Sequence, residues 1–259
     1  MRAEKVFGYV GLGFFFLFPL VSLLQLRDND DAWRQVASRV RPSVLSLHPV
    51  SAAGSTQETA PIASGILLGR DPLRVAVAGR PSSERLASPT SGGWVQWQTV
   101  YEDPQGDFAI LQAAADHAAL AAPPGQAALA PARVSQSAAA PVPAEDPREG
   151  IPAALVAPEH LRSMPIWVGV LTPLDGADGR RAYNTELLRP VQNADILSSA
   201  HAATDPQPDL DPVLRGAPFV GRDGSVVALY IGARDGRSQA VPIAPIRAAL
   251  EDLERRAER

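Results

Sequence analysis

Histidine is the side chain best suited to proton transfer near neutral pH, so the four imidazoles of this chain are its first candidates for catalysis. They are His48, His117, His160 and His201. An imidazole activates a serine hydroxyl only when a carboxylate orients it, so a hydrolase of this kind needs three converging side chains. Lone histidines are more often surface or core residues than catalytic ones. We therefore expect no catalytic role for any of the four.

Several other kinds of chemistry are excluded by composition. The chain has no Cys, which removes disulfides, zinc-thiolate sites, iron-sulfur clusters and thiol catalysis. The motifs G-x-x-x-x-G-K-[ST], G-x-S-x-G and H-E-x-x-H are absent. The acidic run at 205–211 resembles a calcium loop only in charge, because Pro occupies alternate places and the required Gly and Glu are missing. We expect a solvated loop there, no metal site and no cofactor.

Charge argues against nucleic acid as a partner. The formal net charge is -4 at pH 7, and the single lysine is Lys5. Affinity for a phosphate backbone depends on clustered Lys and Arg side chains, so no basic groove is expected.

The N-terminus predicts a membrane anchor. Residues 6–26 carry no charge, and a helix of this length reaches across the roughly 30 Å hydrocarbon core of a bilayer. The apolar run ends without the small residues of a signal-peptidase site, which favours an uncleaved transmembrane helix over a signal peptide. Basic residues precede the run, and three acidic residues follow Arg27. The positive-inside tendency then places residues 1–5 in the cytoplasm and the remaining domain in the periplasm, on a bacterial-type inner membrane.

Behind the anchor, the pattern predicts one helix and then mostly strands. Asp31 begins a short helix, with Trp33, Val36 and Val40 on one face, and Pro42 ends it. Short apolar runs separated by Gly, Pro, Asp and Ser follow, which is typical of an antiparallel barrel or sandwich. The expected strands are 44–47, 65–68, 75–78, 94–97, 108–111, 166–171, 194–197, 218–220 and 226–231.

Three segments of the domain differ in composition. Residues 27–113 form a first β-lobe with the N-terminal helix, and 114–157 are rich in Ala and Pro, as in a linker or surface loop. Residues 158–259 form a second β-lobe, closed by a helix in which Ile246, Leu250 and Leu253 share an apolar stripe.

The order of these segments resembles HtrA/Deg-type trypsin-like serine proteases. In the first lobe the matching runs are Val-Arg-Pro-Ser-Val-Leu-Ser-Leu, then Ala-Ser-Gly-Ile-Leu-Leu, then Asp-Phe-Ala-Ile-Leu at 107–111. In the second lobe they are 215–220, 222–229 and 239–243. The resemblance implies a mainly β, two-lobed trypsin-like antiparallel β-barrel domain, preceded by a single transmembrane α-helix and closed by a C-terminal helix.

The same resemblance indicates a degenerate catalytic site, that is, a pseudoprotease. Asp107 matches the triad carboxylate, but Gly79 stands at or near the histidine position and Arg215 at the nucleophile position. An arginine is no acyl acceptor, so no enzymatic activity is expected. Asp107 has two interpretations: a turn residue that bonds nearby backbone amides, or the partner of Arg215 or Arg80 in an ion pair that locks the old cleft.

Two further sets of residues are candidates for binding. Gly216 and Ala217 belong to the former oxyanion-hole region and form either a plain turn into a strand or a nest of N–H groups able to hold a carboxylate. Trp94 and Trp97 fall on opposite faces of one strand, so one should pack inward. The other is a candidate contact for a partner, because Trp is enriched in interface hot spots.

These observations favour a non-catalytic, membrane-anchored pseudoprotease. We expect a binding or scaffolding role as an accessory subunit of a membrane protein complex, such as a photosynthetic or respiratory assembly. Helix 6–26 would contact this complex within the lipid bilayer, and the extracytoplasmic domain would contact it outside the bilayer. One alternative is an active membrane-anchored serine hydrolase with a non-standard nucleophile, such as Ser64, Ser199 or Ser225. Another is an extracytoplasmic sensor of peptide or peptidoglycan, which would need an open groove beside Gly216.

Overall fold

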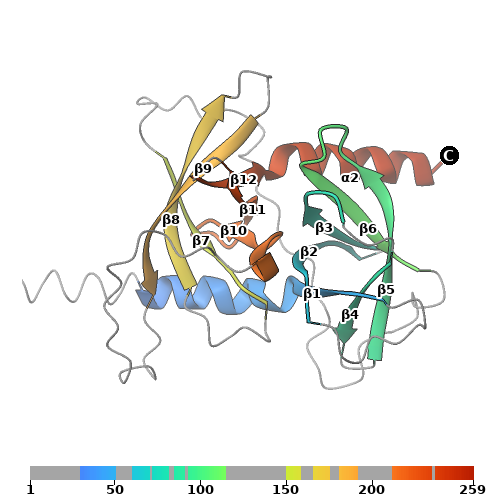
Figure 1. Cartoon of the computed structure of the whole chain (residues 1–259), viewed down its shortest axis with the longest axis horizontal. Coiled ribbons are helices and arrows are strands. Elements are labelled where there is room, and N and C mark those ends of the chain that lie inside the picture. The colour runs from blue at the N-terminus through green and yellow to red at the C-terminus, as the bar shows by residue number, and fades with distance from the viewer. Residues whose placement is uncertain are drawn as a thin grey trace, which may run out of the picture.

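Two β-barrels make up most of the described structure. The computed structural model describes residues 30–50, 60–70, 72–81, 85–90, 93–114, 150–158, 166–175, 181–191, 212–234 and 237–259. Its strands close into two six-stranded antiparallel barrels that lie side by side (Figure 1). The predicted anchor, 6–26, lies outside the described residues, and within them no helix has the length and apolarity to cross a bilayer.

The first barrel uses every strand that the sequence predicts before residue 113, and one more. Its strands pair in the order β1-β2-β3-β6-β5-β4. They are β1 (Val44–Pro49), β2 (Ala63–Arg70), β3 (Leu73–Ala78), β4 (Leu86–Thr90), β5 (Gly93–Glu102) and β6 (Phe108–Ala113). The sequence did not predict β4, in which Ser88 and Pro89 interrupt the apolar pattern. Ser88 is nevertheless buried, because its hydroxyl accepts a hydrogen bond from Trp97 Nε1 at 2.9 Å.

The second barrel pairs its strands in the order β10-β11-β12-β9-β8-β7. They are β7 (Ile151–Leu155), β8 (Ile166–Asp175), β9 (Arg181–Val191), β10 (Pro218–Val220), β11 (Val226–Arg234) and β12 (Arg237–Pro242). A short 3-10 turn, η5 (Pro212–Leu214), precedes β10. The predicted strand at 194–197 lies outside the described residues.

The predicted linker extended too far, because β7 lies within its last residues. Ala153 and Ala154 are fully buried between neighbouring strands, and Leu155 pairs with both Trp167 of β8 and Phe219 of β10. Pairing in a sheet uses the backbone, so small Ala side chains fit there and give no strong apolar signal. The prediction of a linker through residue 157 was therefore wrong at its C-terminal end.

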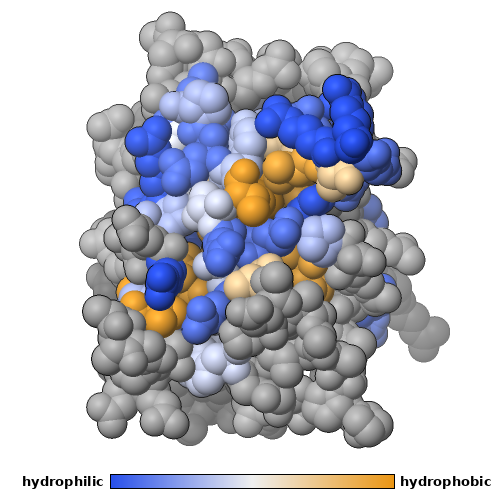
Figure 2. Space-filling model, turned by 90° about the vertical axis from the view of Figure 1, so that its right-hand side faces the viewer, coloured by the Kyte–Doolittle hydropathy of each residue, from blue (hydrophilic) through white to orange (hydrophobic). Residues whose placement is uncertain are grey.

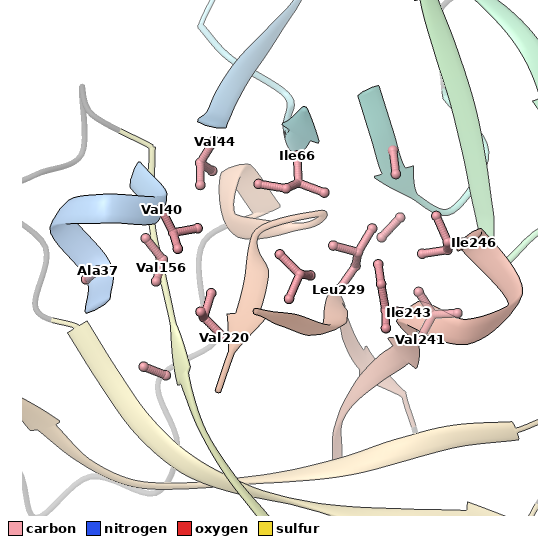
Figure 3. Close-up of a cluster of buried hydrophobic side chains, with 14 of the residues drawn as sticks. Ala37, Val40, Val44, Ile66, Val156, Val220, Leu229, Val241, Ile243 and Ile246 are labelled. Atoms are coloured by element: carbon pink, nitrogen blue, oxygen red, sulfur yellow. The ribbon is translucent and has the colours of Figure 1, made fainter. Parts of the chain in front are cut away.

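The helix that begins the described domain packs on the second barrel, although the sequence assigned it to the first. It occupies residues 30–40 and continues into η1 (Arg41–Ser43) just before β1. Figure 3 shows Ala37 and Val40 next to Val156 and Val220 of the second barrel. The guanidinium carbon of Arg222 also lies 5.6 Å from the centre of the Trp33 ring, a cation–π distance.

The C-terminal helix adjoins the second barrel in the chain but also packs on the first barrel. Helix α2 (Ile243–Ala257) follows β12 of the second barrel, packs against β11 and runs across β6 of the first barrel (Figure 1). Its buried residues Ile246 and Leu250 belong to the same apolar cluster as Phe108 and Ile110. Each barrel is thus covered by the helix that adjoins the other one in the chain, and one continuous core joins the two.

The described residues on the outer face of the first barrel are mostly polar. Figure 2 shows small separate apolar areas between hydrophilic ones, with hydrophilic residues gathered near the top, the height at which α2 runs. Among the described residues Val100 is the one large hydrophobic side chain that is exposed. This face offers no extensive apolar surface within the described part of the chain.

Candidate functional site

The backbone brings Gly79 and Asp107 together at one end of the first barrel. The antiparallel pairing of β3 with β6 ends at Ala78 and Phe108, so the residues just beyond that pair face each other. The N–H of Gly79 donates to the carbonyl of Asp107 at 2.7 Å. Gly79 has a φ of 73°, a conformation that L side chains rarely adopt.

Arg215 reaches the same place from the second barrel. Its carbonyl accepts a hydrogen bond from the N–H of Ser64 in β2 at 2.7 Å. A Cβ atom on the next residue, Gly216, would lie 2.0 Å from the Ser64 carbonyl oxygen and 3.3 Å from the N of Ala78. Because Ala78 adjoins Gly79 and Gly216 adjoins Arg215, the structure brings together all three positions that the sequence assigned to a degenerate triad.

None of the described side chains fills the position at Gly79. A Cβ placed on Gly79 would meet nothing within 4 Å, so the space in front of it is open. Arg215 is exposed, and its Nε donates to the carbonyl of Ile231 at 2.8 Å. Arg215 thus stands at the position that the sequence assigned to the nucleophile, and Gly79 at the one assigned to the base.

Arg80 contacts the turn before β6. Its Nε lies 3.8 Å from a carboxylate oxygen of Glu102, and a Cβ on Gly106 would lie 3.2 Å from this nitrogen. One of the two interpretations of Asp107 paired it with Arg80 or Arg215. The contacts seen here are with Glu102 for Arg80 and with the Ile231 carbonyl for Arg215.

Asp103 is a structural residue that the sequence analysis missed. Its Oδ2 accepts hydrogen bonds from the N–H groups of Gln105 at 3.0 Å and Asp107 at 3.3 Å. Asp103 thus caps this turn, and the side chain of Asp107 is buried. The signal was present, since Asp-Pro-Gln-Gly has the residues favoured at positions one, two and four of a type I turn.

The N–H groups of Gly216 and Ala217 bond within the chain. Gly216 donates to the carbonyl of Tyr230 at 2.7 Å, and Ala217 donates to the carbonyl of Leu214 at 2.8 Å. These two groups form a turn into β10 and have no proton directed at a ligand.

The serines weighed as alternative nucleophiles direct their hydroxyl protons elsewhere. Ser64 Oγ donates to the carbonyl of Val213 at 2.6 Å and is fully buried. Ser225 Oγ donates to Asp223 Oδ1 at 2.7 Å. Ser199 and three of the histidines, His117, His160 and His201, lie outside the described residues.

The two tryptophans of β5 divide as the alternation of strand side chains predicts. Trp97 is buried in the first barrel, whereas Trp94 is half-buried and meets the ring of His48 edge-on, with centroids 5.0 Å apart. Trp94 is therefore the tryptophan of this strand that a partner could reach.

Metal chemistry gains no support from the described side chains. In the described ranges no group of three or more His, Asp or Glu residues is arranged to hold a metal ion.

Comparison with known proteins identifies the fold. No family model matches the chain, and no curated protein matches it. It is similar in structure to the serine endoprotease from Yersinia pestis, with a TM-score of 0.52 and 13% sequence identity. The match covers 86% of this chain and 66% of that one. With the two six-stranded barrels, this likeness shows a trypsin-like fold with a C-terminal helix.

Proposed function

We propose that this protein is a non-catalytic member of the trypsin-like fold that binds and scaffolds, as a membrane-anchored accessory subunit of a membrane protein complex. The proposal rests on which residues stand at the positions that the resemblance assigns to the catalytic triad. Arg215 stands at the position assigned to the nucleophile, bonded through its carbonyl to Ser64 and through Nε to Ile231, and no described side chain fills the space at Gly79, the position assigned to the base.

In this proposal the chain lacks a nucleophile and a base but keeps the two-barrel architecture. A hydroxyl nucleophile requires a base within hydrogen-bond reach, and the buried Ser64 hydroxyl is bonded to a carbonyl that cannot take its proton. The two barrels and the contact between them are retained. A protein that keeps this architecture without its nucleophile is best explained by binding.

The membrane part of the proposal rests on the sequence. The uncharged run at 6–26 has the length of a transmembrane helix, and the described helix begins only a few residues later, at residue 30. That helix buries Trp33 and Val36, so the second barrel would be held close to the bilayer on its outer side. A span of this kind and a rigid domain together give two surfaces for contact with a membrane complex.

The sensor alternative receives less support than scaffolding. It requires a groove beside Gly216, but a single added carbon at that residue would overlap the Ser64 carbonyl. The open space at Gly79 is the one observation that favours it.

Absence of catalysis is tested by covalent labelling. Full-length protein in detergent is treated with a fluorophosphonate probe, which reacts with activated serines, with trypsin as the positive control. We expect no labelling of the wild-type protein. Labelling that disappears in Ser64→Ala or Ser225→Ala would instead establish the serine hydrolase.

The accessory-subunit role is tested by purification from the native membrane in mild detergent. A matched control replaces residues 6–26 with an unrelated transmembrane sequence. We expect the wild-type protein to migrate as part of a larger assembly with a constant set of subunits, and the control to lose some or all of them. Wild-type protein that migrates as a monomer without companions would overturn the proposal.

A further inference from the structure

The guanidinium of Arg215 is held in place before any ligand arrives. Its backbone is fixed by the bond from Ser64, and the residues on either side, Leu214 and Gly216, are buried. Its side chain is exposed, yet Nε is tied to the carbonyl of Ile231 at 2.8 Å. A side chain that is already ordered loses less entropy on binding than a free arginine would.

A bulge in β11 places Ile231 opposite Arg215. The register between β11 and β12 passes from Tyr230 paired with Ala240 to Gly232 paired with Gln239, so Ile231 is the extra residue. Its carbonyl accepts the Nε–H of Arg215, which leaves the donors on Nη1 and Nη2 directed away from this bond. Arg215 forms no ion pair with any residue of the described segments.

Two glycines, Gly79 and Gly232, lie next to residues that contact Arg215 or its neighbour Gly216. A Cβ placed on Gly232 would meet nothing within 4 Å, as at Gly79. Gly232 follows Ile231, whose carbonyl accepts the hydrogen bond from Arg215 Nε. Gly79 follows Ala78, whose backbone N lies close to Gly216. Neither glycine contributes a side chain beside Arg215, whose own side chain is exposed.

From this arrangement we infer that Arg215 is a binding site for a carboxylate of the partner protein. The inference rests on the proposed function, because it names the chemistry by which a site without a nucleophile binds its partner. The planar fork of Nη1 and Nη2 matches the two oxygens of a carboxylate, and such charge-assisted bonds are stronger than neutral ones.

The neighbouring charges favour a monoanion over a phosphate. Arg80, the residue after Gly79, has its Nε 3.8 Å from a carboxylate oxygen of Glu102. One guanidinium then balances one carboxylate, which belongs either to a chain terminus or to an Asp or Glu side chain.

The test is a titration of full-length protein in detergent, labelled with ¹⁵N-arginine, in which NMR follows the Nε–H signal of Arg215. Three peptides are compared: acetyl-Ala-Ala-Ala with a free C-terminal carboxylate, its C-terminal amide, and acetyl-Ala-Glu-Ala-amide. We expect saturable shifts from at least one of the two acids, and none from the neutral amide. The acid that binds identifies the source of the carboxylate.

Two variants make the test specific. We expect Arg215→Gln to weaken binding of the acid by about tenfold or more, measured on the peptide signals, and the matched control Arg80→Gln to change it by less than about twofold. Equal binding of acid and amide, equal binding by wild type and Arg215→Gln, or no shift at millimolar peptide would each overturn the inference. None of these results bears on catalysis, which the fluorophosphonate labelling decides separately.

Discussion

Ser64 of the first barrel and Arg215 of the second are bonded backbone to backbone, with 2.7 Å between the N of Ser64 and the O of Arg215. The Ser64 hydroxyl adds a bond to the carbonyl of Val213, two residues before Arg215. No catalytic side chain takes part in this contact. The placement of Arg215 against the first barrel therefore does not depend on a catalytic triad.

Gly216 should be the least replaceable residue of this contact. In Gly216→Ala the new Cβ would overlap the Ser64 carbonyl, and φ at this residue is 91°. We expect the free energy of unfolding to fall by about 2 to 5 kcal/mol from strain and overlap together. Urea unfolding of the full-length protein in detergent, followed by tryptophan fluorescence, measures the loss.

Gly224→Ala is the matched control for Gly216→Ala. Gly224 has a similar φ of 81°, but a Cβ there would meet nothing within 4 Å. In this variant the unfolding free energy should fall only by the cost of a side chain at a positive φ, about 1 to 2 kcal/mol. Equal losses in the two variants would show that the overlap with Ser64 does not contribute.

Ser64→Ala tests the hydroxyl bond between the barrels. The residue is fully buried, and its Oγ lies 2.6 Å from the Val213 carbonyl, so we expect a loss of about 1 to 3 kcal/mol in unfolding free energy. Ser38→Ala removes an exposed bond of similar length, 2.9 Å to the carbonyl of Gln35, and should change stability much less. A Ser64→Ala protein as stable as Ser38→Ala would contradict this view of the contact.

Arg74 of β3 and Glu254 of the C-terminal helix form an ion pair in which one partner is buried and the other exposed. Arg74 is almost fully buried, its Nε has no hydrogen-bond partner, and Nη1 lies 3.8 Å from the largely exposed carboxylate of Glu254. We expect Arg74→Met to be neutral or stabilising, because an apolar side chain avoids the desolvation of a buried charge. Glu254→Gln should cost under about 1 kcal/mol because solvent screens this pair.

Arg255→Gln provides the control for Glu254→Gln. Its guanidinium pairs with Asp252 at 3.5 Å on the exposed side of the same helix. Thermal melting of the four proteins, wild type included, distinguishes the outcomes. A large loss of stability in Arg74→Met would mean that the buried charge itself holds the helix.

Tyr101 should make stability fall at alkaline pH. Burial raises the pKa of Tyr101 above its ordinary value, and the negative charges of Asp103 and Asp252 raise it further, against a smaller lowering by Arg256. The folded protein therefore holds this proton more tightly than the unfolded chain. The resulting stability is fully present below the unfolded pKa of about 10 and is lost as the pH rises through the folded pKa.

Tyr101→Phe should remove part of that pH dependence and keep the stacked ring contact with Phe108, whose centroid lies 5.7 Å away. The measurement is the urea midpoint at about pH 8 and about pH 11, on either side of the unfolded tyrosine pKa. An unchanged difference between the two midpoints in the variant would contradict the assignment to Tyr101.

The fold was largely predictable because its strands carry local apolar patterns. Val75 to Ala78 and Phe108 to Leu111 are continuous apolar runs, each with a turn residue at one end, and they form neighbouring strands, as expected of a barrel core. β7 was missed because its buried residues are mostly Ala, which packs well but gives a weak pattern. The crossing of the two helices was also missed, because an amphipathic stripe shows that a helix packs without showing what it packs against.

The site was predictable in its positions and not in its contacts. The resemblance placed Gly79, Asp107 and Arg215 in one site, and the structure brings these positions together. The bond from Arg215 to Ile231 depends on a bulge in β11, and a bulge arises from pairing between strands, so a single strand's sequence does not reveal it.

The crossed helices have a consequence for how the chain matures during synthesis. The strands of the first barrel are complete at residue 113, but the helix that covers them comes last, with Ile246 and Leu250 on its buried face. Until that helix emerges, the apolar face beneath it remains without its cover. The earliest barrel to be made is thus the last to be protected, which makes a chain interrupted before residue 243 a preferred target for chaperones and proteases.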